Sequence, residues 1–534
     1  MPNPPNQLGG DSPSIFPLVS KKREIVLFSS TAIALYGYDQ GMMSLINTNY
    51  SYLKTMGIAE ESPIVGIIVS VYYLGCAAGA VVASWLADRE GRKPSIFTCL
   101  ATTALGNILM FVSGLSGLSA EASSSWNGHA IITMLLGRIV MGLGVGGIDA
   151  VIPVYSSELS SDKARGRALA QEFQMNIFGL LVAYAINLGI TIAWGKENQW
   201  AWRVPIIVMQ AFPILLMLVI SRLPETPRWF FSKNRKDDAK DALEDIHGKE
   251  TAASKFAELE KAQEEESNAK VGYKDMLIPG GSHSHPSMVT VMGQINQALT
   301  GYGAVSVYGP QIFELLGFNT RPAEYLTLGN YISYFLTMTI AWLTIDVIGR
   351  RRLMIWGSAG LSASFLLLTI FGGLATVSRI PDLAVEIPGT VILFIATTIF
   401  GITWLPTVWL IPTEIYPSTA RAQGAAISVI VWGFANFTVT LLTPIGFNQL
   451  KYWLFLVFAV TNGFAGWWTK RYSPESGGRS FEDNQGFFES AAKEGSWVVS
   501  KVDGGRFKRM ERKAVEQPEE EEGIRSPLLG RREN

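Results

Sequence analysis

Charged and metal-binding side chains are scarce in this sequence. Only 17% of its residues are Asp, Glu, Lys or Arg, while 48% are apolar, and it contains two cysteines and four histidines. The 44 basic residues almost balance the 45 acidic ones, so charge gives no reason to expect a nucleic-acid partner. Both cysteines, Cys76 and Cys99, lie inside apolar runs, which argues against a disulfide framework. Metal-ligand clusters, nucleophile motifs and phosphate-binding loops are also missing, so we expect neither an enzyme nor a cofactor.

The apolar residues are concentrated in runs that are long enough to cross a lipid bilayer, because a transmembrane helix needs about 20 of them. A large soluble helical protein would show amphipathic stripes instead. We therefore predict an all-α membrane protein with about twelve transmembrane helices in two six-helix halves. The predicted spans are 24–46, 63–87, 95–113, 129–155, 168–193, 203–222, 286–316, 323–346, 351–375, 387–412, 421–446 and 450–470.

Five regions follow from these spans. They are an N-terminal segment, a first half, a helical connector, a second half and a tail, at 1–23, 24–222, 223–285, 286–470 and 471–534. Lys and Arg gather in the connector and in alternate loops, and such loops resist translocation. We therefore expect both termini in the cytosol, with the protein in the plasma membrane. The outer sequon at 49–51 makes Asn49 a candidate glycosylation site.

Two loops carry related charged motifs. The sequence DREGRK occupies 88–93, between the second and third spans, and DVIGRR occupies 346–351, between the eighth and ninth. An acid, a glycine and two bases in equivalent loops of both halves indicate an internal repeat. The glycine permits a tight turn, while the charged side chains can pair with neighbouring helix ends.

Further motifs follow in a fixed order along the chain. They are GR at 137–138, PVYSSE at 153–158, RGR at 165–167, PETPRW at 224–229, PTEIYP at 412–417 and PESGGRS at 474–480. Together with the two charged loops, this set resembles the sugar-porter family of the major facilitator superfamily over about residues 20–485. The connector and the tail motif are most similar to those of fungal members.

The resemblance implies a network of charges that holds the cytosolic ends of the halves together when the carrier faces outward. In it Glu158 pairs with Arg165, Glu414 with Arg421 and Asp88 with Arg92. The alternative is that these charges only anchor helix ends. The expected gate residues are Asp88, Arg92, Glu158, Arg165, Glu225, Arg350, Glu414, Arg421 and Glu475.

An acid inside the first span is a second candidate site. A carboxylate at that depth is costly unless it is paired or hydrated, so Asp39 is a functional candidate, and Arg138 in the fourth span is the available cation. In proton-coupled sugar porters the matching pair takes up and releases the proton. The resemblance therefore implies proton coupling through Asp39 and Arg138. The alternative is a permanent ion pair that fixes helix packing.

The expected solute site departs from the hexose pattern of the family. The resemblance places Gln294, Gln297, Trp409, Asn436, Phe173 and Tyr334 in the cavity. Phe173 stands where the family has glutamine, and Tyr334 where it has asparagine. One interpretation is a more aromatic cavity for a less hydroxylated solute. The other is that Glu172, Gln174 or Asn330 supplies the missing contacts, with Glu172 as a second possible titrating group.

These features predict a secondary active transporter that works by alternating access. We expect proton symport of a small solute, namely a sugar, polyol or sugar-like acid, with the protein active as a monomer in the lipid bilayer. A facilitator or exporter of a specialised metabolite is the alternative within transport. A transporter-like nutrient sensor is the alternative from another class, although the tail is short for a signalling domain.

Overall fold

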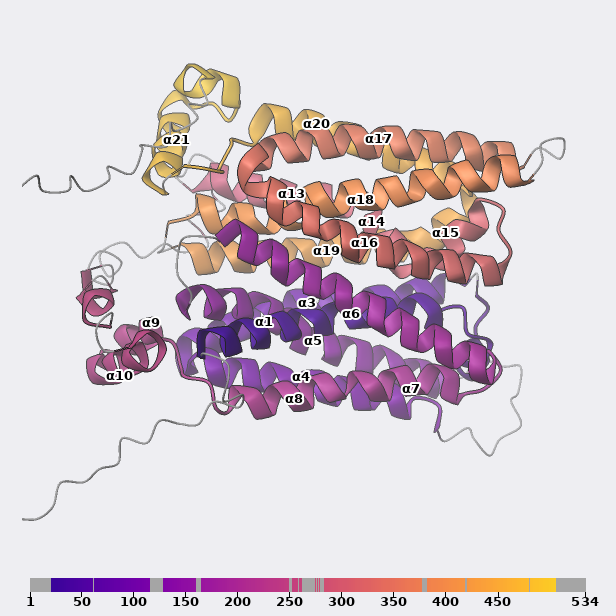
Figure 1. Ribbon diagram of the computed structural model, residues 1–534, viewed down its shortest axis with the longest axis horizontal. Coiled ribbons are helices and arrows are strands. Elements are labelled where there is room, and N and C mark those ends of the chain that lie inside the picture. The colour runs from indigo at the N-terminus through magenta and orange to yellow at the C-terminus, as the bar shows by residue number, and fades with distance from the viewer. Residues whose placement is uncertain are drawn as a thin grey trace, which may run out of the picture.

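Two bundles of long helices lie side by side in the computed structural model (Figure 1). Every regular element in the described part of the chain is a helix, which confirms the predicted all-α membrane protein. The structure describes residues 21–505 except 61, 116–127, 160–164, 249–251, 258, 262–273, 275, 277, 279–282, 377–381, 418–419 and 480.

Each bundle corresponds to one half of the chain. The first contains α1 (Lys21–Ile46), α2 (Tyr50–Met56), α3 (Pro63–Glu90), α4 (Arg92–Val112), α5 (Gly128–Leu159), α6 (Arg165–Trp194), α7 (Trp200–Met209) and α8 (Ala211–Ile220). The second contains α13 (Ser284–Ala298), α14 (Tyr302–Val307), α15 (Gly309–Leu315), α16 (Thr320–Ile348), α17 (Arg350–Ala375), α18 (Asp382–Ile415), α19 (Arg421–Gln449) and α20 (Trp453–Tyr472).

The helices of the two halves pack in the same pattern. In the first half α5 packs against both α3 and α4, and α1 packs against α6. In the second half α18 packs against both α16 and α17, and α13 packs against α19. The halves meet where α3 packs against α19 and α6 packs against α16. Such a pattern is expected when two related six-helix units form one transporter.

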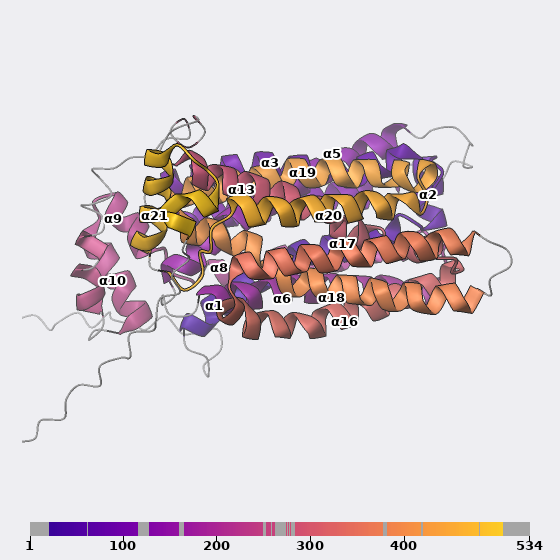
Figure 2. The same cartoon turned by 90° about the horizontal axis from the view of Figure 1, so that it is seen from above.

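Nine stretches of the described chain are helical, long and apolar enough to cross a membrane. They match α3, α4, α5, α6, α7 with α8, α16, α17, α18 and α19. The three other predicted spans lie beside them in the bundle: α1, the interrupted series α13 to α15, and α20 (Figures 1 and 2). We attribute their weaker signal to polar residues in α1 and α20 and to the interruptions in the series.

The predicted seventh span, 286–316, is not one continuous helix. It is interrupted at Gly301, where the backbone has φ 81°, a left-handed conformation that favours glycine. A Cβ atom at Gly301 would lie 2.5 Å from the Phe458 ring, so a larger residue does not fit there. The side chain of Asn462 donates a hydrogen bond to the carbonyl of Thr300 at 3.1 Å, which satisfies one backbone group freed by the break.

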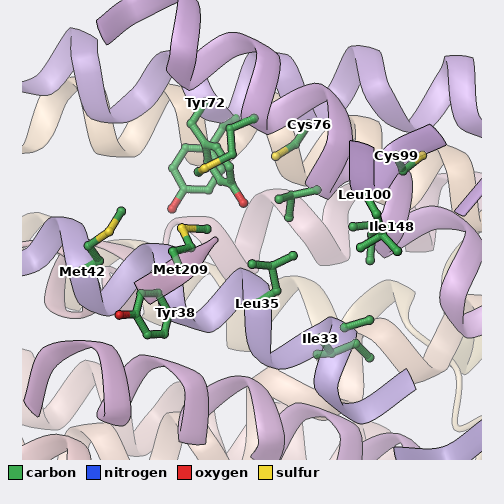
Figure 3. Packing of buried hydrophobic residues seen from close by; sticks show 14 of the residues in the cluster. Ile33, Leu35, Tyr38, Met42, Tyr72, Cys76, Cys99, Leu100, Ile148 and Met209 are labelled. Atoms are coloured by element: carbon green, nitrogen blue, oxygen red, sulfur yellow. The ribbon is translucent and has the colours of Figure 1, made fainter. Parts of the chain in front are cut away.

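Small residues allow α3 and α5 to pack closely in the first half. Cβ atoms at Gly75 and Gly79 would lie 2.4 and 2.0 Å from backbone carbonyl oxygens of α5. This close approach is typical of helix contacts inside membranes. Cys76 and Cys99 are both free thiols in the same buried core (Figure 3).

Short helices lie outside the bundle at its two ends. At one end, called the connector end below, are α9 (Pro227–Ser232), α10 (Lys236–His247), α21 (Phe481–Glu494) and η3 (Val499–Gly505) (Figures 1 and 2). The opposite end carries α2 and is called the α2 end. The start of the tail is docked, because Phe488 and Ala491 of α21 are buried and Asn484 donates to the carbonyl of Glu414 at 3.2 Å.

Candidate functional site

A half-buried carboxylate caps one helix in each half at the connector end. Glu225 accepts hydrogen bonds from the backbone N–H groups of Arg92 and Lys93, at 3.1 and 2.9 Å, where α4 begins. These N–H groups have no partner within the helix, and the helix dipole favours an anion there. Burial raises the pKa of Glu225, although the backbone N–H groups act in the opposite direction.

The second half repeats this arrangement. Glu475 accepts from the backbone N–H groups of Arg350 and Arg351, at 2.8 and 3.2 Å, where α17 begins. The preceding residues are glycines in both halves, Gly91 with φ 114° and Gly349 with φ 96°. Only glycine adopts this backbone conformation easily, so the glycine of each charged loop allows the turn into the capped helix.

The arginines of these loops pair within their own half. Arg92 lies 3.4 Å from Asp88 and 3.2 Å from Glu158. Arg350 repeats these contacts at 2.9 Å from Asp346 and 2.7 Å from Glu414. Each network therefore ties together helices of one half.

The expected pairings of Glu158 with Arg165 and of Glu414 with Arg421 stay predictions, and the described contacts of the two acids are with other residues. The structure pairs Glu158 with Arg92, and Glu414 with Arg350 and with Ser476 at 2.6 Å. The side chain of Arg165 lies outside the described residues, and Arg421 is the first residue of α19. A linear motif does not reveal that the loop arginine turns back along its own helix end.

Contacts between the halves are found at the α2 end. Lys196 of the first half lies 2.6 Å from Glu324 of the second, and Arg321 lies 3.0 Å from the same carboxylate. Glu324 is 0% exposed. The hydroxyls of Ser44 and Tyr331 add a hydrogen bond between the halves at 3.1 Å. This ion pair was not predicted from the sequence, although Glu324, an acid at the start of the eighth predicted span, indicated a charged site there.

The structure brings the two predicted coupling residues into contact. Arg138 Nη1 of α5 lies 2.5 Å from Asp39 Oδ1 of α1, and each residue is 1% exposed. Arg138 also donates to the carbonyls of Ile68 and Val69 at 3.3 and 3.2 Å, and its guanidinium lies 4.6 Å from the Tyr72 ring centre. The pair is therefore enclosed, and the cation is held by several groups besides the acid.

An aromatic cluster lies between the halves. Phe173 of α6 packs against Trp409 of α18, with ring centres 5.7 Å apart, and Trp409 lies 5.8 Å from Trp432 of α19. Trp432 in turn contacts Tyr36 of α1 and Tyr73 of α3, at 5.4 and 5.3 Å. These five residues, the aromatic cluster below, join five helices. Only Phe173 and Trp409 were predicted from the sequence. Tyr36 and Tyr73 join the cluster only when the halves dock, and Trp432 joins it through the packing of α19 against α18.

The other predicted solute residues lie within the second half. Gln294 donates to Ser428 Oγ at 2.6 Å, and Gln297 donates to the Trp404 carbonyl at 3.3 Å. Asn436 donates to the carbonyl of Trp432 at 2.9 Å, next to the aromatic cluster. Tyr334 packs against the ring of Tyr302, with centres 4.9 Å apart. All four of these side chains are buried.

Asn49 occupies a structural position. Its side-chain oxygen accepts a hydrogen bond from the backbone N–H of Tyr52 at 3.0 Å and so caps α2. The residue is 2% exposed, and Nδ2, the atom that would carry a glycan, is buried. The folded protein thus gives an oligosaccharide no access to Asn49, and the structure offers no support for the predicted glycosylation.

Relatives with similar sequences are membrane transporters. The chain is 28% identical over 511 residues to the MFS-type transporter oryC of Aspergillus oryzae, which covers 93% of this chain and 90% of that protein. It is also 28% identical over 476 residues to the major myo-inositol transporter IolT of Bacillus subtilis, which covers 86% and 93%.

The fold is also similar to that of a solved transporter. The major facilitator superfamily proton:xylose symporter XylE of Escherichia coli, bound to 6-bromo-6-deoxy-D-glucose, matches with a TM-score of 0.70 and 22% identity, over 88% of this chain and 99% of that one. A family profile described as sugar (and other) transporter matches residues 25–488. The chain therefore belongs to this sugar transporter family of the major facilitator superfamily.

Proposed function

We propose that this transporter couples the movement of a sugar, polyol or sugar-like acid to that of a proton, with Asp39 as the proton-binding group. The enclosed contact between Asp39 and Arg138 carries this proposal. Ionisable residues at membrane depth mark ion and proton pathways. The proton:xylose symporter with a similar fold supports the same conclusion.

Coupling follows from the charge of this pair. While Arg138 contacts Asp39, the carboxylate is compensated and stays ionised. When a conformational change separates them, a bare carboxylate in an apolar site is costly, and binding of a proton removes that cost. The proton then crosses with the solute, and the membrane potential drives the step with about 2.3 kcal/mol per charge and 100 mV.

We further propose that the connector end faces the cytosol and that the protein acts as a monomer in the plasma membrane. The excess of basic residues in the connector and in the loops at that end supports this orientation. The ion pair of Lys196 with Glu324 would then close the outer side. A cleft of about 290 Å³ opens at the connector end between α3, α5 and α19, which fits a state that faces inward.

The aromatic cluster is the proposed solute site, together with Gln297 and Asn436. Aromatic faces bind the apolar face of a ring-shaped solute, while amide groups bind its hydroxyls. Phe173 in place of the family glutamine leaves fewer hydrogen-bond partners than a hexose requires. We therefore expect glucose to be a poorer solute than a ring-shaped compound with fewer hydroxyls.

Export or facilitated diffusion of a specialised metabolite is the second candidate function. The aromatic cluster favours it, because apolar ring contacts suit solutes with few hydroxyls. Purified protein in liposomes distinguishes the candidates. We expect an imposed pH gradient to drive accumulation of at least one of D-xylose, D-glucose, myo-inositol and quinate, and Asp39→Asn to abolish accumulation while exchange continues. Accumulation by Asp39→Asn equal to that of the unaltered protein would contradict the coupling role.

A further inference from the structure

A second acid lies inside the first half without a partner. Asp149 is in α5, eleven residues after Arg138, so the two residues lie on the same side of the helix about three turns apart. No hydrogen bond or ion pair joins the Asp149 carboxyl to any described residue, and no described cation offsets its desolvation. A carboxyl without a partner is rare inside a transmembrane helix and is usually a functional group.

The groups around Asp149 connect it to the Asp39 site. From α1, Tyr36 lies within electrostatic reach of Asp149, and from α3, Tyr72 and Cys76 do. Tyr36 and Tyr72 are also within reach of Asp39. Tyr72 also lies beside the cation of the Asp39 pair, because its ring centre is 4.6 Å from the Arg138 guanidinium. A phenol O–H both donates and accepts hydrogen bonds, so Tyr72 can take part in proton transfer between the two acids.

Access to water distinguishes the two acids. The Asp39 pair is enclosed, whereas Asp149 is half-buried. The next residue, Ala150, lines the cleft at the connector end, together with Val151 and Val154. That cleft reaches the charged loop at Asp88. Asp149 thus lies between the enclosed pair and the open end of the bundle.

We propose that Asp149 exchanges the coupling proton between Asp39 and water at the connector end. This inference rests on the proposed function of Asp39. When Arg138 returns to Asp39, the protonated carboxyl of Asp39 loses its proton and becomes a carboxylate. The Asp149 carboxylate gains that proton, through the Tyr72 hydroxyl and intervening water molecules, and becomes a neutral acid. It then releases the proton to water in the cleft and is a carboxylate again.

Glu172 of α6 is the matched comparison. It is also a buried acid of the first half, but it accepts a hydrogen bond from Ser156 at 3.2 Å. A comparison of Asp149→Asn with Glu172→Gln therefore distinguishes a loss of proton exchange from a general effect of removing a buried acid.

The test uses the purified full-length protein in liposomes, with radiolabelled D-xylose and myo-inositol as probes. We expect Asp149→Asn to slow net uptake driven by a pH gradient about tenfold or more, as loss of a proton-transfer group does. Net uptake by this variant should no longer depend on the pH at the connector side, while the rate of exchange of labelled for unlabelled solute should stay the same. Asp149→Glu should restore net uptake, and Glu172→Gln should keep the pH dependence of the unaltered protein.

A second measurement does not depend on a solute. Infrared difference spectra between two pH values should show the C=O stretch of a protonated carboxyl that is lost in Asp149→Asn and kept in Asp39→Asn. If Asp39→Asn abolishes accumulation while Asp149→Asn matches the unaltered protein in both measurements, the inference about Asp149 is wrong and the proposed function stands. If Asp39→Asn itself accumulates solute normally, the proposed function is wrong.

Discussion

The two halves of this transporter are alike at the connector end and different in the middle of the membrane. At the connector end, Glu225 and Glu475 cap helices in the same way, and Arg92 and Arg350 pair with equivalent acids. In the middle, the first half carries Asp39, Arg138, Asp149 and Glu172. The described middle of the second half carries neutral polar and aromatic side chains instead, such as Gln297, Tyr302, Tyr334 and Asn436.

This difference shows which parts of the repeat are structural. The networks at helix ends satisfy backbone groups that every such helix leaves unpaired, so both halves need them. Ionisable groups in the middle are costly, so Asp39, Arg138 and Asp149 are expected to serve transport, whereas Glu172 has a hydrogen-bond partner in Ser156. We therefore interpret the first half as the site of proton chemistry and the second as the main source of solute contacts.

The largest effect is expected from Arg138→Ala. This substitution leaves Asp39 buried without its cation, and the loss of one partner from a buried ion pair costs about 3–5 kcal/mol. Thermal unfolding in detergent measures the loss. The double variant Asp39→Asn with Arg138→Ala should recover part of it, because no uncompensated charge remains. A single variant that unfolds at the temperature of the unaltered protein would show that the pair is not buried as described.

Arg92→Ala and Arg350→Ala, at the connector end, are expected to destabilise the protein equally. Arg92→Ala and Arg350→Ala each remove one guanidinium from the same set of contacts, and hydrogen bonds to charged groups contribute about 1.5–3 kcal/mol. Their unfolding temperatures should fall by similar amounts. If only one variant is destabilised, the two networks are not equivalent and the comparison between the halves fails.

A smaller and purely binding effect is expected from Gln297→Ala. If Gln297 contacts the solute, its loss leaves a solute hydroxyl without a partner, at a cost of about 1–3 kcal/mol. The apparent KM for the best-transported solute of the panel should rise roughly ten- to a hundredfold. The pH dependence should not change, because Gln297 carries no charge. A changed pH profile would place proton chemistry in the second half as well.

The smallest effect is expected from Phe173→Gln. It exchanges one ring of the aromatic cluster for the amide that the family pattern has at this position, and it should shift the ratio of uptake rates from D-xylose toward D-glucose, which has one more hydroxyl. Competition between the two labelled solutes measures this ratio. Phe173→Leu is the control, because it removes the ring and adds no amide. An equal shift in both variants would assign selectivity to the loss of the ring alone.

The sequence predicted the spans and the charged loops because both depend on local patterns. Apolar runs located the helices, and the order of motifs indicated the family. The interruption at Gly301 was missed because a glycine inside an apolar run also fits an unbroken helix. Asp149 was missed for a different reason, since the argument applied to Asp39 holds equally for a lone acid in the fourth span.

The sequence predicted the contact of Arg92 with Asp88, but the contacts of Arg92 with Glu158 and of Arg350 with Glu414 and the full aromatic cluster were beyond prediction from one sequence. Arg92 contacts Glu158 across 66 positions, and Trp432 contacts Tyr36 across about three quarters of the chain. Such contacts depend on how helices rotate and how the halves dock. The periodicity of an almost uniformly apolar helix does not specify its rotation, because no polar face marks the side toward solvent.

The ion pair at the α2 end has a consequence for the speed of transport. Glu324 between Lys196 and Arg321 is desolvated, so much of the attraction between the charges is offset by their lost hydration. When this end opens, water hydrates the separated charges and compensates most of the lost attraction. The contact therefore aligns the halves accurately without trapping them in a deep energy minimum. A carrier that must close and reopen in every cycle gains from such a closure, because reopening requires little activation energy.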